Sequence, residues 1–271
     1  MTKKTQILSA VACLFASATI TMANEAAAGT DGVAALMSDK SVLEAQKDWE
    51  TKISLGYELN NGNTESESFT GAISTEKNLG VWRFNGKIEG SYKEDKVKDA
   101  NGNKIKEQTD GQAKLKADLM RLIDEYFVYV GEELTHDAIA GVKYRSITSL
   151  GIGVFLWDEP NFRFPISAGL AYVKEKAPKS DDYIALRLQE ESTWNVNNNL
   201  KVWQKFEVIP QIDDFDNVLI NGEIGGEAKL TTTLSLTMKL IIEYDSDPGF
   251  DNGVELEETD TKFITQISYT F

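Results

Sequence analysis

From Thr51 to the end of the chain, apolar and polar side chains alternate with a period of two. The segment WRFNGKIEGSY shows this most clearly, because Trp82, Phe84, Ile88 and Tyr92 share one face with two glycines while polar and charged residues occupy the other. This is the period of a β-strand, whose successive side chains point to opposite sides of a sheet. The same alternation recurs in segments 52–59, 113–119, 162–172, 218–230, 234–244 and 263–271. The pattern predicts an all-β fold.

The lengths of these segments and of their connections predict a membrane-spanning barrel. Ten residues at roughly 3.3 Å each, tilted near 45°, rise about 23 Å, which matches the apolar band of an outer-membrane barrel. Five short connections alternate with six that are mostly longer and more charged. About twelve strands are therefore expected, with both ends of the barrel on the short-turn side. We predict a single antiparallel transmembrane outer-membrane β-barrel over residues 49–271, in the outer membrane of a Gram-negative bacterium.

The aromatic residues are sorted along the predicted strands. Trp49, Trp82, Trp157 and Trp194 lie at or next to the strand ends assigned to the short turns, and Trp203 lies a few residues further in. The tyrosines that fall toward the other end are Tyr57, Tyr92, Tyr172 and Tyr244. Two interfacial aromatic girdles would produce this distribution, whereas a water-soluble sandwich has no reason to sort tryptophan to one end.

Some segments give no unique register. EYFVYVGEEL is apolar on both faces for several residues, and LKVWQKFEV could turn either Val202 or Trp203 outward. In ITSLGIGVFLW, Ile147 and Leu150 fall on opposite faces. Pro165 lacks a backbone N–H for the ladder, so a bulge or a strand start is expected there.

Charged residues on the polar faces are the main functional lead. A charge that faces lipid at mid-bilayer costs about 2 to 4 kcal/mol, so these side chains are expected to face the lumen. The predicted lumen-lining residues are Arg83, Lys87, Glu89, Lys114, Lys116, Asp118, Arg163, Glu223, Glu227, Lys229, Lys239 and Glu243. A lumen wider than that of an eight-stranded barrel could form a narrow aqueous channel. The alternative is that opposite charges pair and plug it, and the sequence leaves both open.

The N-terminus has the pattern of a secretory signal. Lys3 and Lys4 precede the apolar stretch ILSAVACLFASATITMA, which closes on small residues. We predict a signal peptide over residues 1–23, with cleavage after Ala28 as the alternative. Residues 24–48 are small and polar, and are expected to form a periplasmic lead-in, flexible or with a short helix, that either trails from the barrel or plugs it.

The composition and net charge limit the classes of partner that the protein can bind. The only cysteine, Cys13, lies in the predicted signal peptide and fits a lipoprotein box poorly, so the mature protein is expected to lack disulfides. Loss of Lys3 and Lys4 takes the basic residues from 28 to 26 against 43 acidic ones, a formal charge of −17 that argues against nucleic acid. Beyond the first two dozen residues there is no run of about 18 uncharged apolar residues, which excludes transmembrane helices. Expected partners are outer-membrane lipid, lipopolysaccharide and the barrel assembly machinery.

The sequence offers little support for a catalytic or metal-binding site. His136 is the only histidine, and although Asp137 follows it, no nucleophile-elbow context supports a hydrolase. Asp245, Asp247 and Asp251 invite a calcium site, but the spacing fails the EF-hand pattern, so a solvated outer loop is expected. No metal site, cofactor or catalytic residue is predicted, and the protein is not expected to be an enzyme.

Three stretches resemble a known family. LGYELNNGNTESES, HDAIAGVKYRSITSLGIG with Asp137, Arg145, Gly151 and Gly153, and the closing SYTF are similar to the YdiY-like, salt-induced outer-membrane protein family, domain of unknown function 481. The resemblance spans nearly the whole predicted mature chain, from Trp49 onward. It implies an outer-membrane barrel and brings no established activity or catalytic residue. The charged insert KEDKVKDANGNKIKEQ is more elaborate than the resemblance leads us to expect, so no outer-loop function carries over.

The leading functional hypothesis is a porin-like, narrow passive channel or a salt-induced envelope-stress component. The alternative is a structural, non-conducting barrel whose acidic loops stabilise the envelope or bind a ligand. A hydrolase and a soluble secreted β-barrel are lesser alternatives, because the period of two cannot distinguish the inside from the outside. The terminal Phe271 resembles the aromatic last residue that such barrels present to their assembly machinery, and it is predicted to be an assembly signal.

Overall fold

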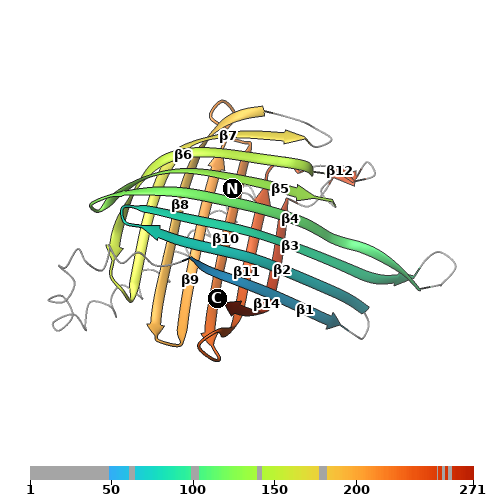
Figure 1. Cartoon of the computed structure of the whole chain (residues 1–271). Coiled ribbons are helices and arrows are strands. Elements are labelled where there is room, and N and C mark those ends of the chain that lie inside the picture. The colour runs from blue at the N-terminus through green and yellow to red at the C-terminus, as the bar shows by residue number, and fades with distance from the viewer. Residues whose placement is uncertain are drawn as a thin grey trace, which may run out of the picture. The chain divides into compact units, whose positions relative to one another are not determined.

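The computed structural model describes fourteen β-strands, twelve of which close into one antiparallel barrel (Figure 1). The described residues are 49–60, 65–98, 104–138, 142–176, 182–248, 250–251, 254–255 and 258–271. The barrel strands are β1 (Glu50–Asn60), β2 (Glu65–Leu79), β3 (Trp82–Lys98), β4 (Lys104–Ile123), β5 (Tyr126–Asp137), β6 (Val142–Asp158), β7 (Phe162–Lys176), β8 (Asp182–Asn197), β9 (Leu200–Pro210), β10 (Val218–Lys229), β11 (Leu234–Asp245) and β14 (Thr259–Thr270). The short strands β12 (Phe250–Asp251) and β13 (Val254–Glu255) pair with each other. The expected single all-β barrel of about twelve strands is confirmed, while the predicted signal peptide and lead-in lie outside the described residues.

Short turns join the strands at one end of the barrel. They comprise residues 80–81, 124–125, 159–161, 198–199 and 230–233. Two of these turns contain left-handed backbone, at Gly80 with φ 63° and at Asp124 with φ 55°, which suits two-residue hairpin connections. Each barrel strand pairs with the next barrel strand along the chain, so that β11 pairs with β14, and β1 pairs with β14 to close the barrel. The barrel therefore begins and ends on the short-turn side, as the connection lengths predict.

The outward face of the barrel is largely apolar. Exposed large side chains on this face include Leu55, Ile88, Val130, Leu150, Leu170, Ile224 and Phe263. Exposed aromatic side chains near the two ends include Trp82, Trp157, Tyr57, Tyr92 and Tyr172. Contiguous apolar surface of this extent is rare on soluble monomers and is the hallmark of a lipid-facing barrel wall. No helix in the described part of the chain is long and apolar enough to cross a membrane.

The registers that the sequence left open follow from packing inside the barrel. Trp203 of β9 points inward, where its ring lies against Gly225 of β10, so Val202 is the outward residue. In β6, Ile147 points inward and is 3% exposed, whereas Leu150 points outward and is 65% exposed. Large apolar side chains therefore occur on the inward face as well as on the outward face.

At Pro165 and at the charged insert, the structure differs from what the sequence predicts. Pro165 interrupts the pairing of β7 with β8, but the bulge lies in the other neighbour, between Phe155 and Trp157 of β6. The insert KEDKVKDANGNKIKEQ, expected as a loop, instead lengthens the β3–β4 hairpin, whose pairing continues to Lys98 and Lys104. In Figure 1 this hairpin projects beyond the neighbouring strands.

The closing seam between β1 and β14 is short. Four residues of β1, 52–55, pair with β14. Inside the barrel the hydroxyls of Ser54 and Ser268 lie 2.7 Å apart. At the end of the seam the backbone N–H of Phe271 donates to the carbonyl of Thr51 at 2.9 Å. The alternating final strand thus closes the wall and leaves its last aromatic side chain on the outward face.

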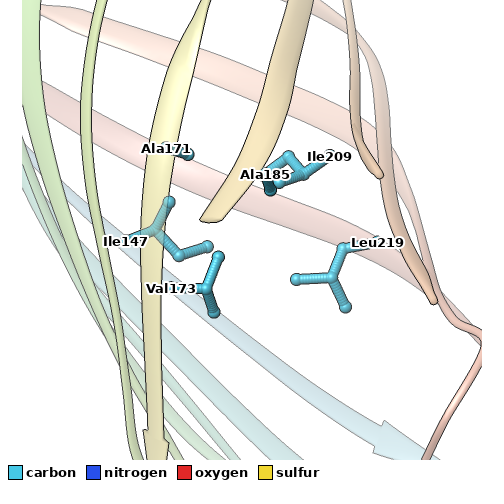
Figure 2. Packing of buried hydrophobic residues seen from close by; sticks show 6 residues of the cluster. All are labelled: Ile147, Ala171, Val173, Ala185, Ile209 and Leu219. Carbon is cyan, nitrogen blue, oxygen red and sulfur yellow. The ribbon is translucent and has the colours of Figure 1, made fainter. Parts of the chain in front are cut away.

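Part of the interior is a dry apolar cluster rather than a polar lumen. Its members, which we call the inner apolar cluster, are Ile147, Ala171, Val173, Ala185, Ile209 and Leu219. They come from the neighbouring strands β6 to β10 and point toward one another in Figure 2. Val173, Ala185 and Ile209 are fully buried. This side of the barrel interior is therefore filled by side chains.

An aromatic cluster fills a second part of the interior, on β5 and β6. It consists of Phe127, Tyr129 and Phe155, with the Phe127 and Phe155 rings 5.1 Å apart. The rings of Phe127 and Tyr129 lie across Gly153 and Gly151, where a Cβ would collide with them. The two glycines of the GIG sequence therefore provide the space that lets large rings lie flat against the inner wall.

Candidate functional site

The lumen contains a cavity of about 380 Å³ lined by ten strands, β2 to β5, β7 to β11 and β14. The predicted lumen residues that line it are Lys87, Glu89, Lys114, Lys116, Asp118, Glu223, Lys239 and Glu243. The other four, Arg83, Arg163, Glu227 and Lys229, lie on β3, β7 and β10 closer to the short-turn end. The structure thus brings eight of the twelve predicted residues together, because the β-strand period points them all inward.

A chain of ion pairs occupies the middle of this cavity. Lys239 of β11 lies 3.4 Å from Glu223 on neighbouring β10 and 3.3 Å from Glu89 on β3. Glu89 also pairs with Lys87 of its own strand at 2.6 Å. Because β3 and β11 are four places apart in the closed strand order, the contact between Lys239 and Glu89 bridges separate parts of the wall.

A second group of ion pairs crosses the lumen between β4 and β11, which are five places apart in the strand order of twelve. Lys114 of β4 donates to Glu243 of β11 at 2.9 Å and lies 3.6 Å from Glu133 of β5. Lys262 of β14 lies 3.5 Å from Glu243, while Lys116 lies 3.9 Å from Glu133. This cross-lumen group therefore ties nearly opposite walls of the barrel together.

A third bridge, which the sequence reasoning missed, lies at the long-loop end. Arg145 of β6 pairs with Glu175 on neighbouring β7 and donates from Nη2 to Asp245 on β11 at 2.5 Å. Strands β6 and β11 are again five places apart. Ile147, two residues further along β6, belongs to the inner apolar cluster. Arg145 was noticed only as part of a family-like motif, and nothing in the sequence indicated its partner.

One fully enclosed arginine joins the inner apolar cluster to the charged lumen. Arg187 is 1% exposed, pairs with Glu207 at 2.6 Å and donates to the hydroxyl of Ser149. Glu207 also accepts from Gln189 at 2.7 Å and from Asn221 at 3.0 Å. Several donors to one carboxylate compensate for its removal from water. This group is best regarded as a structural element of the wall.

At the short-turn end the cationic side chains approach aromatic rings. The guanidinium carbon of Arg83 lies 5.5 Å from the centre of the Phe155 ring, and that of Arg163 lies 6.0 Å from it. Arg163 also donates to Asp158 at 2.8 Å. Lys52 of β1 pairs with Glu227 at 2.5 Å. Arg83 of β3 and Lys52 of β1 thus reach strands that are not their neighbours, at the end of the barrel that carries the short turns.

The arrangement is a polar cavity whose charges are largely paired. Cations and carboxylates alternate around the cavity, so each charge is partly neutralised by a neighbour. The ion pairs of Lys114, Lys239 and Arg145 join strands that are not neighbours, and the two apolar clusters also lie in the interior.

Residues of the other two candidate sites make structural contacts, as Asp245 does with Arg145. The Nδ1 atom of His136 lies 3.0 Å from the backbone carbonyl oxygen of Lys143, so Nδ1 carries the proton and the ring is held at the strand end. Among the described residues, no group of three or more His, Cys, Asp or Glu side chains is placed to hold a metal ion. The side chain of Asp251, part of the calcium hypothesis, lies outside what the structure describes.

A family model described as "Protein of unknown function, DUF481" matches residues 53–271. The comparison with curated protein sequences found no match. Similar solved structures include the NanC porin (9% identity, 83% of this chain and 100% of that chain, TM-score 0.49), the KdgM porin (9%, 83% and 99%, 0.43) and an anion-selective porin from Comamonas acidovorans (9%, 83% and 99%, 0.41). At such identities and scores these likenesses say nothing of what this barrel carries or binds.

Proposed function

We propose a function from the barrel itself, because the chain belongs to a family, described as protein of unknown function DUF481, that brings no established activity. The proposed function is a narrow passive channel for small ions and hydrophilic solutes across the outer membrane of a Gram-negative bacterium. The observation that carries it is the water-accessible lumen, lined by charged side chains and crossed by ion pairs.

The outward wall supports a membrane location. Exposed apolar side chains surround the barrel, and aromatic side chains lie near both ends of its strands. In lipid, unpaired backbone groups are too costly to leave open, and a closed barrel satisfies them between strands. The long-loop end would then face the outside and the short turns the periplasm, which is the usual arrangement of outer-membrane barrels.

The lining predicts the sign of the ions that pass. Six lysines and nine carboxylates line the cavity, so carboxylates are in excess by three. An excess of negative charge raises the local concentration of cations. We therefore propose a weak preference for cations, and a small conductance because the ion pairs occupy the cross-section.

Planar bilayers provide the test. Purified protein should give small unitary conductances, and a KCl gradient should give a reversal potential of cation-selective sign. Lys114→Met removes one of the two side chains of the β4–β11 bridge and should increase both conductance and cation preference. Lys143→Met, at the exposed end of β6, is the matched control and should leave both unchanged. Consistent absence of conductance in folded protein would reject the channel.

A structural, non-conducting barrel is the second candidate, and the extent of interior packing favours it. The inner apolar cluster, the aromatic cluster and the paired charges occupy space that an open pore would leave to water. This candidate expects a salt-dependent or divalent-dependent envelope defect on deletion of the gene, without any change in solute uptake. Uptake of small cations that falls on deletion would favour the channel instead.

A further inference from the structure

A polar patch interrupts the outward wall on β5, β6 and β7. We define this outward patch as Glu132, Ser146, Thr148, Tyr172, Lys174 and Lys176. Glu132 lies between Gly131 and Glu133, both of which are buried on the inward face, and it alternates with the exposed side chains of Val130 and Leu134. Its carboxylate therefore points away from the lumen, toward the surface that the apolar side chains occupy.

The Glu132 carboxylate is held in place by two hydroxyls of the neighbouring strand. Ser146 donates to Oε1 at 2.6 Å and Thr148 donates to Oε2 at 2.5 Å. Each carboxylate oxygen of Glu132 thus accepts a hydrogen bond from a hydroxyl of β6. Glu132 is nevertheless partly exposed, and exposed Leu150 lies beside it. The lone pairs of the Glu132 carboxylate that these two hydroxyls do not use face outward, where lipid acyl chains offer no hydrogen-bond donor.

The patch rises from the apolar band to the long-loop end. Glu132 is six residues beyond Tyr126, at the short-turn end of β5, a rise of about 14 Å at the usual strand spacing and tilt. Thr148 pairs with both Glu132 and Tyr172. Lys174 and Lys176 follow on the same face of β7, toward the long loops, and both are exposed. Two ammonium groups thus lie above the Glu132 carboxylate, and the exposed carboxylate of Asp182, which pairs in register with Lys174, lies beside them.

We propose that the outward patch binds a phosphorylated outer-leaflet glycolipid, such as that of lipopolysaccharide, whose acyl chains begin with amide or hydroxyl groups. The phosphate lies against Lys174 and Lys176, since ammonium groups bind phosphate through charge-assisted hydrogen bonds. An amide N–H or hydroxyl at the top of an acyl chain donates to Glu132. This explains an ionisable side chain at membrane depth, which otherwise requires a polar partner.

A second copy of the chain fits the patch less well. Two copies related by an axis along the membrane normal bring together residues of equal depth. With the axis through the patch, Lys174 and Lys176 of one copy would meet the same lysines of the other, which is repulsive. A lipid that carries its phosphate at the membrane surface and its amide or hydroxyl donors below it matches the depth of the two lysines and the depth of Glu132. The inference requires the barrel to lie in the membrane, but it does not require the lumen to conduct.

Native mass spectrometry of the folded barrel with two defined lipids tests the assignment. Ceramide 1-phosphate and phosphatidic acid of matched chain length both carry a phosphate monoester, but only ceramide 1-phosphate has amide and hydroxyl donors below it. The first should be retained about tenfold better, as one charge-assisted hydrogen bond predicts. Glu132→Gln should abolish this preference, and Lys174→Gln should weaken retention of both lipids. Glu133→Gln, next in sequence but facing the lumen, should leave the preference intact.

Three results would overturn the proposal. Equal retention of the two lipids by the native barrel would show that Glu132 does not bind the lipid donors. A preference for ceramide 1-phosphate that persists in Glu132→Gln would show the same. A dimer of the native chain that Glu132→Gln dissociates would assign the patch to a second copy. Heat-modifiable gel migration shows that each variant is folded before it is compared, and Glu132→Leu replaces Glu132→Gln should the latter fail to fold.

Discussion

The cross-lumen bridge between Lys114 and Glu243 allows the energetic role of the lumen charges to be measured. The two charges lie 2.9 Å apart, with side chains 18% and 20% exposed. Coulomb's law gives about 6 kcal/mol at an effective dielectric of about 20 and about 1.4 kcal/mol in bulk water. Because the pair is mostly but not fully shielded from water, we expect a coupling free energy between these limits, about 2 to 3 kcal/mol.

A double-mutant cycle isolates this coupling. Lys114→Met, Glu243→Gln and the double variant are unfolded with urea in lipid vesicles, and tryptophan fluorescence gives the free energy of unfolding of each. Lys114→Met should be the more destabilising single change, because it leaves Glu133 as well as Glu243 without its closest cation. Lys262 still lies 3.5 Å from Glu243, so the loss should be partial.

An exposed pair inside the same barrel supplies the matched control. Lys205 and Glu191 lie 3.1 Å apart, almost the same distance, but their side chains are 50% and 48% exposed. Their coupling should be at most about 0.5 to 1 kcal/mol. Equal couplings for the two pairs would refute the reasoning, because distance alone would then decide the energy. A Lys114 coupling below about 0.5 kcal/mol would show that water screens the lumen as fully as it screens an outer surface.

Three further predictions concern single residues of the barrel wall. Gly153→Ala should lower the free energy of unfolding by about 1 to 3 kcal/mol, because its Cβ would lie 2.6 Å from the carbonyl oxygen of Ile166. Gly71→Ala, where the nearest atom is 3.7 Å away, should cost much less, and equal urea midpoints would contradict this account. Deletion of Phe271 should reduce membrane insertion, measured by fractionation and heat-modifiable migration, before it alters conductance, and unchanged insertion would reject the assembly-signal prediction. In single-tryptophan variants, brominated lipid should quench Trp82 and spare the inward Trp203, and strong quenching of Trp203 would reverse its assigned orientation.

The outward wall and the strand count were predictable from the sequence, whereas the contacts inside the lumen were not. A period of two fixes which side chains share a face, so Lys114 and Lys239 could be assigned inward before their partners were known. Which residues meet across the lumen depends on strand tilt and register all around the barrel, and no local pattern encodes that Lys114 meets Glu243. Glu132 shows a further limit, because the run of apolar residues around it concealed a carboxylate on the lipid-facing side.

The interior of the barrel departed from expectation in a consistent way. Polar faces were assumed to point inward, but Phe127, Tyr129 and Ile147 are inward and buried. In strands that are apolar on both faces, alternation of polarity cannot identify the inside. The glycines at 151 and 153 held the missing signal, since a residue without a Cβ in a strand often marks the close approach of another group.

The short closing seam determines the order in which the wall forms. Every other pair of barrel neighbours joins strands that are consecutive or nearly so along the chain, and such hairpins form early because little chain must be closed into a loop. Ser54 and Ser268 are 214 residues apart, so their contact is expected to form last. With four paired residues of β1 holding it, the seam is also where the barrel would first come apart. Its kinetic lifetime in the membrane would then depend on these few residues rather than on the ion pairs of the lumen.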